Sequence, residues 1–232
     1  MRLRRRRISV IIAALIAAAV WLFLNPNSYE EVFTPISDTE ATTEVSGMPA
    51  IKVLEELEVK GRAPKKGYSR EEFYDGWPVV DGCSLRQKIL KRELGETAVL
   101  EGCNVVAGEF DEPYTGEHVV LRNRTDVADI QIDHVVALSD AWQKGAQYLD
   151  YETRNKIATD PLNLLAVDGD ANEQKSDGDA ATWLPKNKKF RCQYVARQVS
   201  VKFKYSLWVT EAEKEAIQRV LTNCPNEPIV GV

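Results

Sequence analysis

Two adjacent polar residues, Asp133 and His134, stand inside a short apolar segment in the middle of the chain. They follow the alternating stretch 129–132, and a second short apolar run covers residues 164–167. A Gly-Asp turn then leads into a polar stretch with helical character. Alternation is typical of a half-buried strand, and a short apolar run bounded by turn residues is typical of a buried one. We therefore expect strand, long excursion, strand and helix, with the end of the first strand and the first turn of the helix meeting around a cation.

The polar residues in this segment are those that phosphodiester hydrolysis requires. The reaction needs a base to activate water and a cation to neutralise charge on the phosphate and the departing oxygen. A neutral imidazole, with an ordinary pKa of about 6.5, suits the first task. Carboxylate and amide oxygens are hard ligands that match a magnesium-like ion. We expect Asp133 and Asn172 to supply these oxygens, His134 to be the general base, and Lys175 to offer a positive group to the substrate.

The spacing of these residues resembles that of the HNH (ββα-metal) endonucleases. The pattern is Asp133-His134, then Asn163, then Asn172 with Lys175 after it, and Asn172 stands where many members have a final His. The wider sequence is similar to a branch of secreted or surface HNH proteins related to the C-terminal domain of GmrSD-type restriction enzymes. That resemblance runs from Tyr68 to Cys224 and is carried by three stretches: 111–116, 131–142, and 160–167 continuing to 178–185.

The resemblance implies a role for each matching residue. Asp133 and Asn172 would bind one divalent ion, His134 would be the general base, and Asn163 would pin the loop between the strands by hydrogen bonds to its backbone. Mg²⁺ is the expected ion, with Mn²⁺ or Ca²⁺ as alternatives, and the oxygen ligands argue against zinc. The expected substrate is nucleic acid, DNA in preference to RNA, cut to leave 5′-phosphate and 3′-hydroxyl ends by a monomer with no evident protein partner.

The N-terminal residues 1–24 are predicted to direct the chain to a membrane. Five arginines among residues 2–7 precede Ile8–Leu24, a run without charge. This run is short for a spanning helix and long for the core of a signal peptide, and no tidy cleavage site follows it. We favour an uncleaved signal-anchor over a removed signal peptide. Since basic residues remain on the cytoplasmic side, the rest of the chain is expected outside the membrane.

Four cysteines agree with an exported protein. Their spacing lacks the close pairs of a zinc site, and an even number in an oxidising compartment favours two disulfides. Of the three possible connectivities we prefer Cys83–Cys103 with Cys192–Cys224, because each bond closes a local unit.

The rest of the chain reads as a tether and one domain of α+β class, in which the hairpin-and-helix site is embedded in a mostly helical domain with a few short antiparallel strands. Residues 25–66 are acidic and polar and are predicted to be a largely disordered tether, with a possible short helix over 51–57. The domain is expected over 67–226 and a tail over 227–232. Capping residues at Ser69, Ser84 and Thr210 predict helix starts, and short strands are expected near 98–100, 103–108 and 117–122.

The formal net charge of −5 is unusual for a protein that binds a polyanion, so the distribution of charge matters more than its sum. Residues 185–204 hold seven basic side chains and no acidic one. Within them Lys186, Lys189 and Arg197 are candidates for phosphate contact, although a solvated face is the alternative. Arg122 and Arg124 are further candidates. His118, the second histidine, is read as structural.

Two other functional classes remain open from the sequence. The loop Asp168-Gly-Asp170 also resembles the start of a calcium loop, which would make the protein a non-catalytic, calcium-stabilised surface binding module. A toxin-like or defence nuclease directed at a neighbouring cell is the other possibility.

Overall fold

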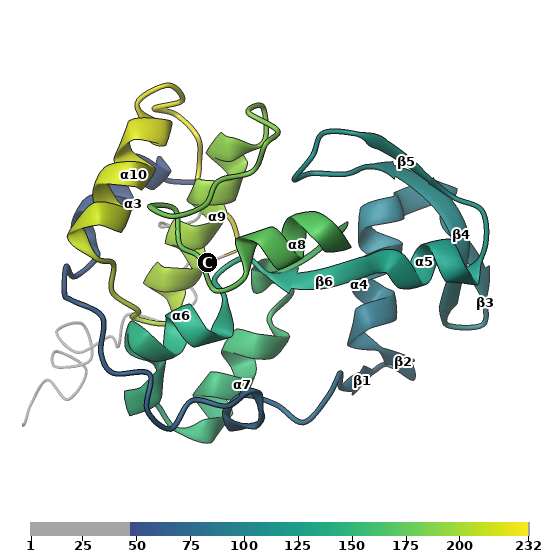
Figure 1. Cartoon of the computed structure of the whole chain (residues 1–232), viewed down its shortest axis with the longest axis horizontal. Helices are drawn as coiled ribbons and strands as arrows, with labels where there is room; N and C mark the ends of the chain where they lie inside the picture. The colour runs from purple at the N-terminus through teal and green to yellow at the C-terminus, as the bar shows by residue number, and fades with distance from the viewer. Residues whose placement is uncertain (1–46, 232) are drawn as a thin grey trace, which may run out of the picture. The chain divides into compact units, whose positions relative to one another are not determined.

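Eight α-helices and three small antiparallel sheets make up residues 47–231, the part of the chain that the computed structural model describes (Figure 1). The first sheet pairs β1 and β2, the second has the order β3-β4-β5, and the third pairs β6 and β7. The strands are β1 (Val79–Val80), β2 (Cys83–Ser84), β3 (Val99–Glu101), β4 (Asn104–Asp111), β5 (His118–Leu121), β6 (Ile130–His134) and β7 (Leu164–Asp168). The helices are α3 (Ala50–Glu56), α4 (Leu85–Leu94), α5 (Arg124–Asp129), α6 (Leu138–Gln143), α7 (Tyr151–Thr159), α8 (Gly169–Lys175), α9 (Arg191–Lys204) and α10 (Glu211–Leu221).

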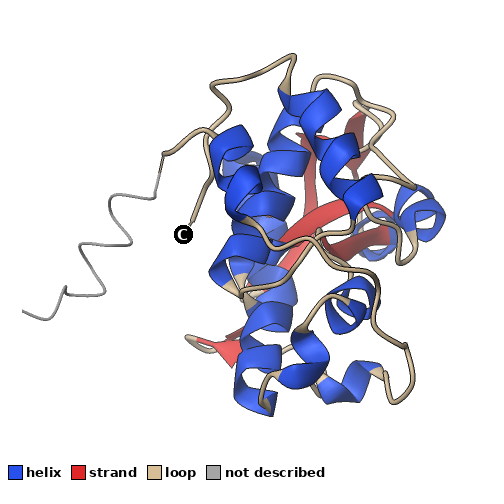
Figure 2. Ribbon diagram, turned by 90° about the vertical axis from the view of Figure 1, so that its left-hand side faces the viewer, coloured by secondary structure: helices blue, strands red, loops and turns tan. Residues whose placement is uncertain are grey.

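The mixed α+β class predicted from the sequence is confirmed, and Figure 2 shows the central strands lying among helices. Ser84 caps α4 through a bond from the backbone N–H of Gln87, and Thr210 forms a full capping box with Glu213 at the start of α10. Ser69 makes no capping bond, and a short 3₁₀ turn, Arg70–Glu72, follows it.

The hairpin of β6 and β7 lies inside the molecule and is buried on both faces. Ile130 pairs with Asp168 at one end and His134 with Leu164 at the other. Successive side chains of a strand point to opposite faces. Accordingly Leu165 belongs to the core cluster with α9, whereas Leu164 belongs to the cluster with α4. Burial on both faces explains why the β7 sequence is apolar without alternation.

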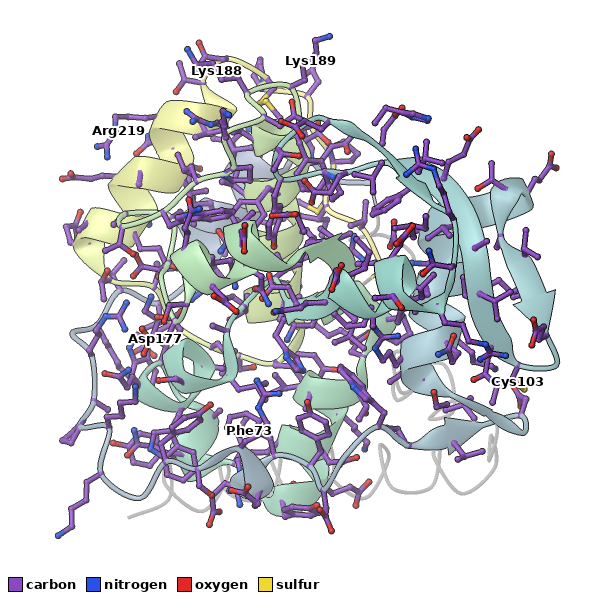
Figure 3. All side chains as sticks on the ribbon, turned by 45° about the vertical axis from the view of Figure 1, so that its right-hand side comes forward. Phe73, Cys103, Asp177, Lys188, Lys189 and Arg219 are labelled. Atoms are coloured by element: carbon purple, nitrogen blue, oxygen red, sulfur yellow. A yellow bond between two sulfur atoms is a disulfide. The ribbon has the colours of Figure 1, made fainter. Side chains whose placement is uncertain are left out.

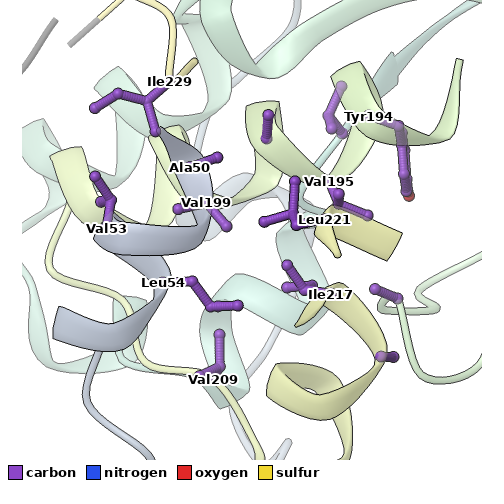
Figure 4. Close-up of a cluster of buried hydrophobic side chains, with 14 of the residues drawn as sticks. Ala50, Val53, Leu54, Tyr194, Val195, Val199, Val209, Ile217, Leu221 and Ile229 are labelled. Atoms are coloured by element: carbon purple, nitrogen blue, oxygen red, sulfur yellow. The ribbon is translucent and has the colours of Figure 1, made fainter. Parts of the chain in front are cut away.

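Helix α3 extends the domain well before the predicted boundary at residue 67. Ala50, Val53 and Leu54 are almost fully buried against α9 and α10 (Figure 4). The backbone N–H of Ala50 also donates to the carbonyl of Glu227, at 2.8 Å. Residues 50–57 therefore belong to the core and not to a tether, because a short amphipathic helix gains its stability from packing that composition does not reveal. Most of residues 58–66 are exposed. The tail differs from the expectation as well, since Ile229 is buried.

The predicted signal-anchor and the first part of the tether, residues 25–46, lie outside the described residues. Within 47–231 no helix has both the length and the apolar character needed to cross a bilayer.

Both predicted disulfides are confirmed. Cys83–Cys103 joins β2 to the turn between β3 and β4, with Cα atoms 5.4 Å apart. Cys192–Cys224 joins the first turn of α9 to the end of α10, with Cα atoms 6.4 Å apart. The two bonds brace opposite sides of the molecule: Cys103 lies across from Arg219, a residue of α10 (Figure 3).

A buried network of charges joins distant parts of the fold. Lys144 lies 2.7 Å from both Asp140 and Asp179 and 2.6 Å from Glu213. Lys202 lies 3.0 Å from Glu213, and Arg62 lies 2.8 Å from Asp179. The network links residue 62, α6, the segment after α8, α9 and α10. Its three cations balance its three acids, as buried charges require. Five of the six are buried, and Arg62 reaches the network from the surface.

Candidate functional site

The C-terminal end of β6, the first residues of β7 and helix α8 form one hairpin-and-helix unit, as the sequence predicts. Asp168 accepts a hydrogen bond from the backbone N–H of Ala171 and so caps α8 at its first turn. This capping fixes where the helix begins and thereby places Asn172 beside β6. Because α8 already begins at Gly169, residues 168–179 do not form an extended calcium loop, and the calcium-module reading loses its support.

Asp133 is almost fully buried and accepts hydrogen bonds from two side chains. One carboxylate oxygen accepts from the ammonium of Lys175, at 2.9 Å, and the other accepts from the hydroxyl of Tyr114. Burial raises the pKa of Asp133 above its ordinary value, while the charge of Lys175 and the bond from Tyr114 oppose that rise. A carboxylate has about four acceptor positions, so these two donors leave room for a cation.

His134 follows Asp133 on β6 and is held in one orientation. Its Nε2 lies 2.9 Å from the carbonyl oxygen of Ala158, near the end of α7. A carbonyl only accepts, so Nε2 carries the proton and Nδ1 carries a lone pair. The ring of Trp77 stacks on the imidazole, with centroids 6.0 Å apart. Burial lowers the pKa of His134 to about 3, the bond to Ala158 opposes this, and the imidazole is neutral at neutral pH.

Asn163 makes the backbone hydrogen bonds expected of it. Its side-chain oxygen accepts from the N–H of Val136 at 2.8 Å, and its nitrogen donates to the carbonyls of Ile157 and Val136. The side chain is completely buried. These bonds connect the start of β7 to the residues after β6 and to the end of α7. The carbonyl of Ala158, next to that of Ile157, accepts the hydrogen bond from His134.

Asn172 lines the same cavity as Asp133 and His134, a cavity of about 450 Å³. Its amide nitrogen donates to the side chain of Gln131 at 2.8 Å, so the amide oxygen is the atom available as a ligand. Asp133 and Asn172 therefore offer two hard oxygen donors to one space, which fits a magnesium-like ion. Nowhere in residues 47–231 do three or more His, Cys, Asp or Glu side chains gather as a ready metal site. A magnesium-like ion bound through one carboxylate and one amide usually keeps several waters.

None of the predicted substrate-binding residues lines the site cavity, although Lys186, Lys189 and Arg197 line a second cavity together. Lys175 is buried, and its ammonium bonds to Asp133 and to the carbonyl of His134, so it faces the interior and not a substrate. Arg197 donates to the carbonyls of Pro161, Leu162 and Leu164 and braces the start of β7.

The other basic candidates lie away from the site cavity. Lys186 and Lys189 line a separate cavity of about 860 Å³ near residues 113–116. Arg122 and Arg124 line neither of these cavities, and Arg124 pairs with Glu101. Sequence spacing cannot reveal these placements, because they depend on how separate elements pack. His118 pairs with Asp111 across β4 and β5 and does not line the site cavity, in agreement with a structural role.

Residues that the sequence did not single out lie at the site instead. Arg70, Lys65 and Tyr68 line the cavity from the segment before β1, and Tyr114 reaches Asp133 from the turn after β4. Tyr114 lies within one of the three stretches that carried the family resemblance. The segment before β1 has no sequence motif that would predict which of its side chains line the cavity.

Comparison with known proteins identifies the family of the chain. The chain matches the family described as GmrSD restriction endonucleases, C-terminal domain, over residues 86–220. It is also 34% identical over 182 residues to an uncharacterized secreted protein of Arthroderma benhamiae, covering 77% of this chain and 86% of that protein. No solved structure matches. On the strength of the family match, which spans the hairpin, α8, α9 and nearly all of α10, the chain belongs to the family of the C-terminal domains of GmrSD restriction endonucleases.

Proposed function

We propose that this protein is a metal-dependent endonuclease of the HNH type, which hydrolyses phosphodiester bonds of nucleic acid, DNA in preference, outside the cytoplasmic membrane. One observation carries the proposal: Asp133, His134 and Asn172 line a single cavity, with His134 neutral and oriented by a backbone carbonyl. Membership of a restriction-endonuclease family supports it.

Each residue has a distinct part in the proposed reaction. The Nδ1 atom of His134 accepts a proton from the attacking water, and Asp133 and Asn172 would hold one divalent ion, Mg²⁺ by preference. When bound, this ion supplies positive charge against the phosphate and the leaving oxygen. Asn163 fixes the loop that orients His134. Lys175 faces Asp133 and not the substrate, and its positive charge opposes the rise in the pKa of Asp133 that burial causes.

The test is a plasmid-nicking assay with Mg²⁺, Mn²⁺ or EDTA, beside calorimetric titration of the ion. Loss of a general base costs about 10²–10⁴-fold in rate, so His134→Ala should nearly abolish nicking and leave ion affinity intact. Asp133→Ala and Asn172→Ala should weaken ion binding, and a higher concentration of metal should partly restore nicking. His118→Ala is the matched histidine control and should cut normally. If His134→Ala nicks the plasmid at the wild-type rate, His134 is not the general base and the proposed site is wrong.

The proposed location rests on separate observations. Disulfides persist in oxidising compartments, and both pairs of cysteines are bonded here. The Arthroderma benhamiae relative is described as secreted. A reporter enzyme fused after Val232 that is active only outside the cytoplasm should therefore give signal. Signal from a cytoplasm-specific reporter at the same position would contradict export.

A further inference from the structure

Arg70 is an exposed cation at the edge of the site cavity. It begins the short 3₁₀ turn Arg70–Glu72 and lines the same cavity as Asp133, His134 and Asn172. Within the described part of the chain, no carboxylate lies at ion-pair distance from its guanidinium. Lys65, the other basic residue lining this cavity, differs in this respect because it pairs with Asp177 at 2.9 Å.

The guanidinium of Arg70 is held beside the proposed general base. Its Nη1 donates to the hydroxyl of Tyr74 at 3.2 Å, and its central carbon lies 5.9 Å from the centre of that ring. Tyr74 is buried, and its ring centre lies 5.8 Å from that of His134. A guanidinium has five N–H donors, so the bond to Tyr74 leaves several for a ligand.

The charges around the cavity indicate what this ligand is. Three acidic residues line the cavity: Asp133, Glu173 and Asp177. Lys65 already forms an ion pair with Asp177. A phosphodiester that enters would approach these carboxylates with a negative charge of its own. Arg70 is the lining cation that can meet that charge, since a guanidinium matches the geometry of phosphate oxygens.

We propose that Arg70 binds a nonbridging oxygen of the phosphate that is cut, and is thus a catalytic residue of the reaction. The proposal rests on the function proposed above. As the oxygen of water bonds to phosphorus and the bond to the leaving oxygen breaks, charge grows on the nonbridging oxygens. Arg70 donates hydrogen bonds to that charge and transfers no proton, because the proton of water goes to His134.

The structure also offers a different role that the experiment must separate. Arg70 could act only by bracing Tyr74, which contacts His134. Tyr74→Phe removes the hydroxyl that Arg70 binds and keeps the ring. A bracing role predicts that Tyr74→Phe loses as much activity as Arg70→Ala, whereas phosphate binding predicts that Tyr74→Phe stays close to wild type.

The experiment compares single-turnover cleavage by the full chain and its variants on a labelled duplex. Removing one donor to a developing oxyanion costs about 10²–10³-fold, and we expect a loss of this size for Arg70→Ala. Arg70→Lys should fall between the two. Arg219→Ala, which removes an exposed arginine of α10 that does not line the cavity, should remain within a few fold of wild type. The Mn²⁺ concentration that gives half-maximal rate should not change in Arg70→Ala. Thermal unfolding of each variant checks that the substitutions leave the fold intact.

A substrate with sulfur in place of one nonbridging oxygen gives a readout that a structural role would not move. With sulfur at the position that Arg70 contacts, the loss caused by Arg70→Ala should shrink for one diastereomer only. Wild-type protein that cuts with every tested ion while Arg70→Ala cuts equally fast would overturn this proposal alone. Wild-type protein that fails to cut with any ion would overturn the proposed function together with it.

Discussion

Tyr114 contacts the Asp133 carboxylate from outside the hairpin-and-helix unit. It is completely buried, and burial raises its pKa well above the ordinary value, so its hydroxyl keeps its proton and donates to Asp133. The turn that carries it is closed by the buried carboxylate of Glu112, which accepts from the N–H of Tyr114 at 3.0 Å and of Asp168 at 3.2 Å. One acidic turn therefore connects to both the carboxylate of the site and the start of α8.

Removal of the Tyr114 hydroxyl should destabilise the protein through Asp133. Tyr114→Phe keeps the ring against Trp183 and Tyr194 and leaves a buried carboxylate oxygen without its donor. Such an oxygen costs about 1–3 kcal/mol of unfolding free energy, and more where the group is charged. Urea unfolding of the metal-free protein measures the loss. In an Asp133→Asn background the same substitution should cost clearly less, and an equal cost in both backgrounds would rule out the coupling.

The sequence predicts the position of a site residue correctly where that position depends on local spacing along the chain. The order Asp133-His134, Asn163 and Asn172 fixes neighbours along one strand, one loop and one helix. Asp133, His134 and Asn172 line one cavity, and Asn163 lies buried behind the loop that follows His134. Lys175 shows the limit of this reasoning. The spacing from Asn172 puts it on the same side of α8, but only packing of α8 on the hairpin decides that its ammonium turns inward to Asp133.

At the scale of elements, the sequence predicts strands and caps better than it predicts boundaries. The strands expected near 98–100, 103–108 and 117–122 occur as β3, β4 and β5, with ends shifted by up to three residues. Both disulfides follow from the preference for local loops. The sequence predicts helix α3 only as a possibility. Its three buried side chains stabilise the helix by packing against α9 and α10, which lie far along the chain.

Truncation before and after α3 separates the two boundaries. A chain that begins at residue 47 keeps α3 and its contact with Glu227, whereas one that begins at residue 61 exposes the faces of α9 and α10 that Val53 and Leu54 cover. Loss of a single large buried aliphatic side chain costs about 2–5 kcal/mol, so the shorter chain should unfold at much lower urea or fail to fold. Circular dichroism during urea titration compares the two. Equal midpoints would show that α3 is dispensable.

At the scale of the whole molecule, the buried charge network joins the segment that borders the site to the C-terminal helices. Arg62 belongs to the segment that continues to Lys65, Tyr68 and Arg70, which line the site cavity. Asp179 enters the network from the segment that leaves α8, and Glu213 from α10. The segment before β1 and the segment after α8, which both contribute residues to the cavity lining, are thus linked through this network. Removal of one partner from such a network leaves an uncompensated buried charge and is strongly destabilising.

Asp179 makes this network sensitive to acid. Burial alone would raise its pKa, but Lys144 and Arg62 outweigh burial and lower the pKa from 3.8 to about 2. A carboxyl whose pKa is lower in the folded state stabilises the protein above the unfolded pKa, and this contribution is lost as pH falls through the folded pKa. The window is therefore pH 4 to 2, and the contribution is about 2 kcal/mol by linkage.

We predict that the difference in unfolding free energy between wild type and Asp179→Asn becomes smaller in acid. Asp179→Asn should be less stable than wild type at pH 5–7, and the gap should narrow as pH falls from 4 to 2, because only the wild type loses the ionised carboxylate there. Urea unfolding at half-unit pH steps measures it. Asp177→Asn is the matched control, since Asp177 is exposed and its pair with Lys65 lies outside the network, so it should show a small gap throughout. A gap for Asp179→Asn that stays constant from pH 7 to 2 would mean that this carboxylate does not hold the network together.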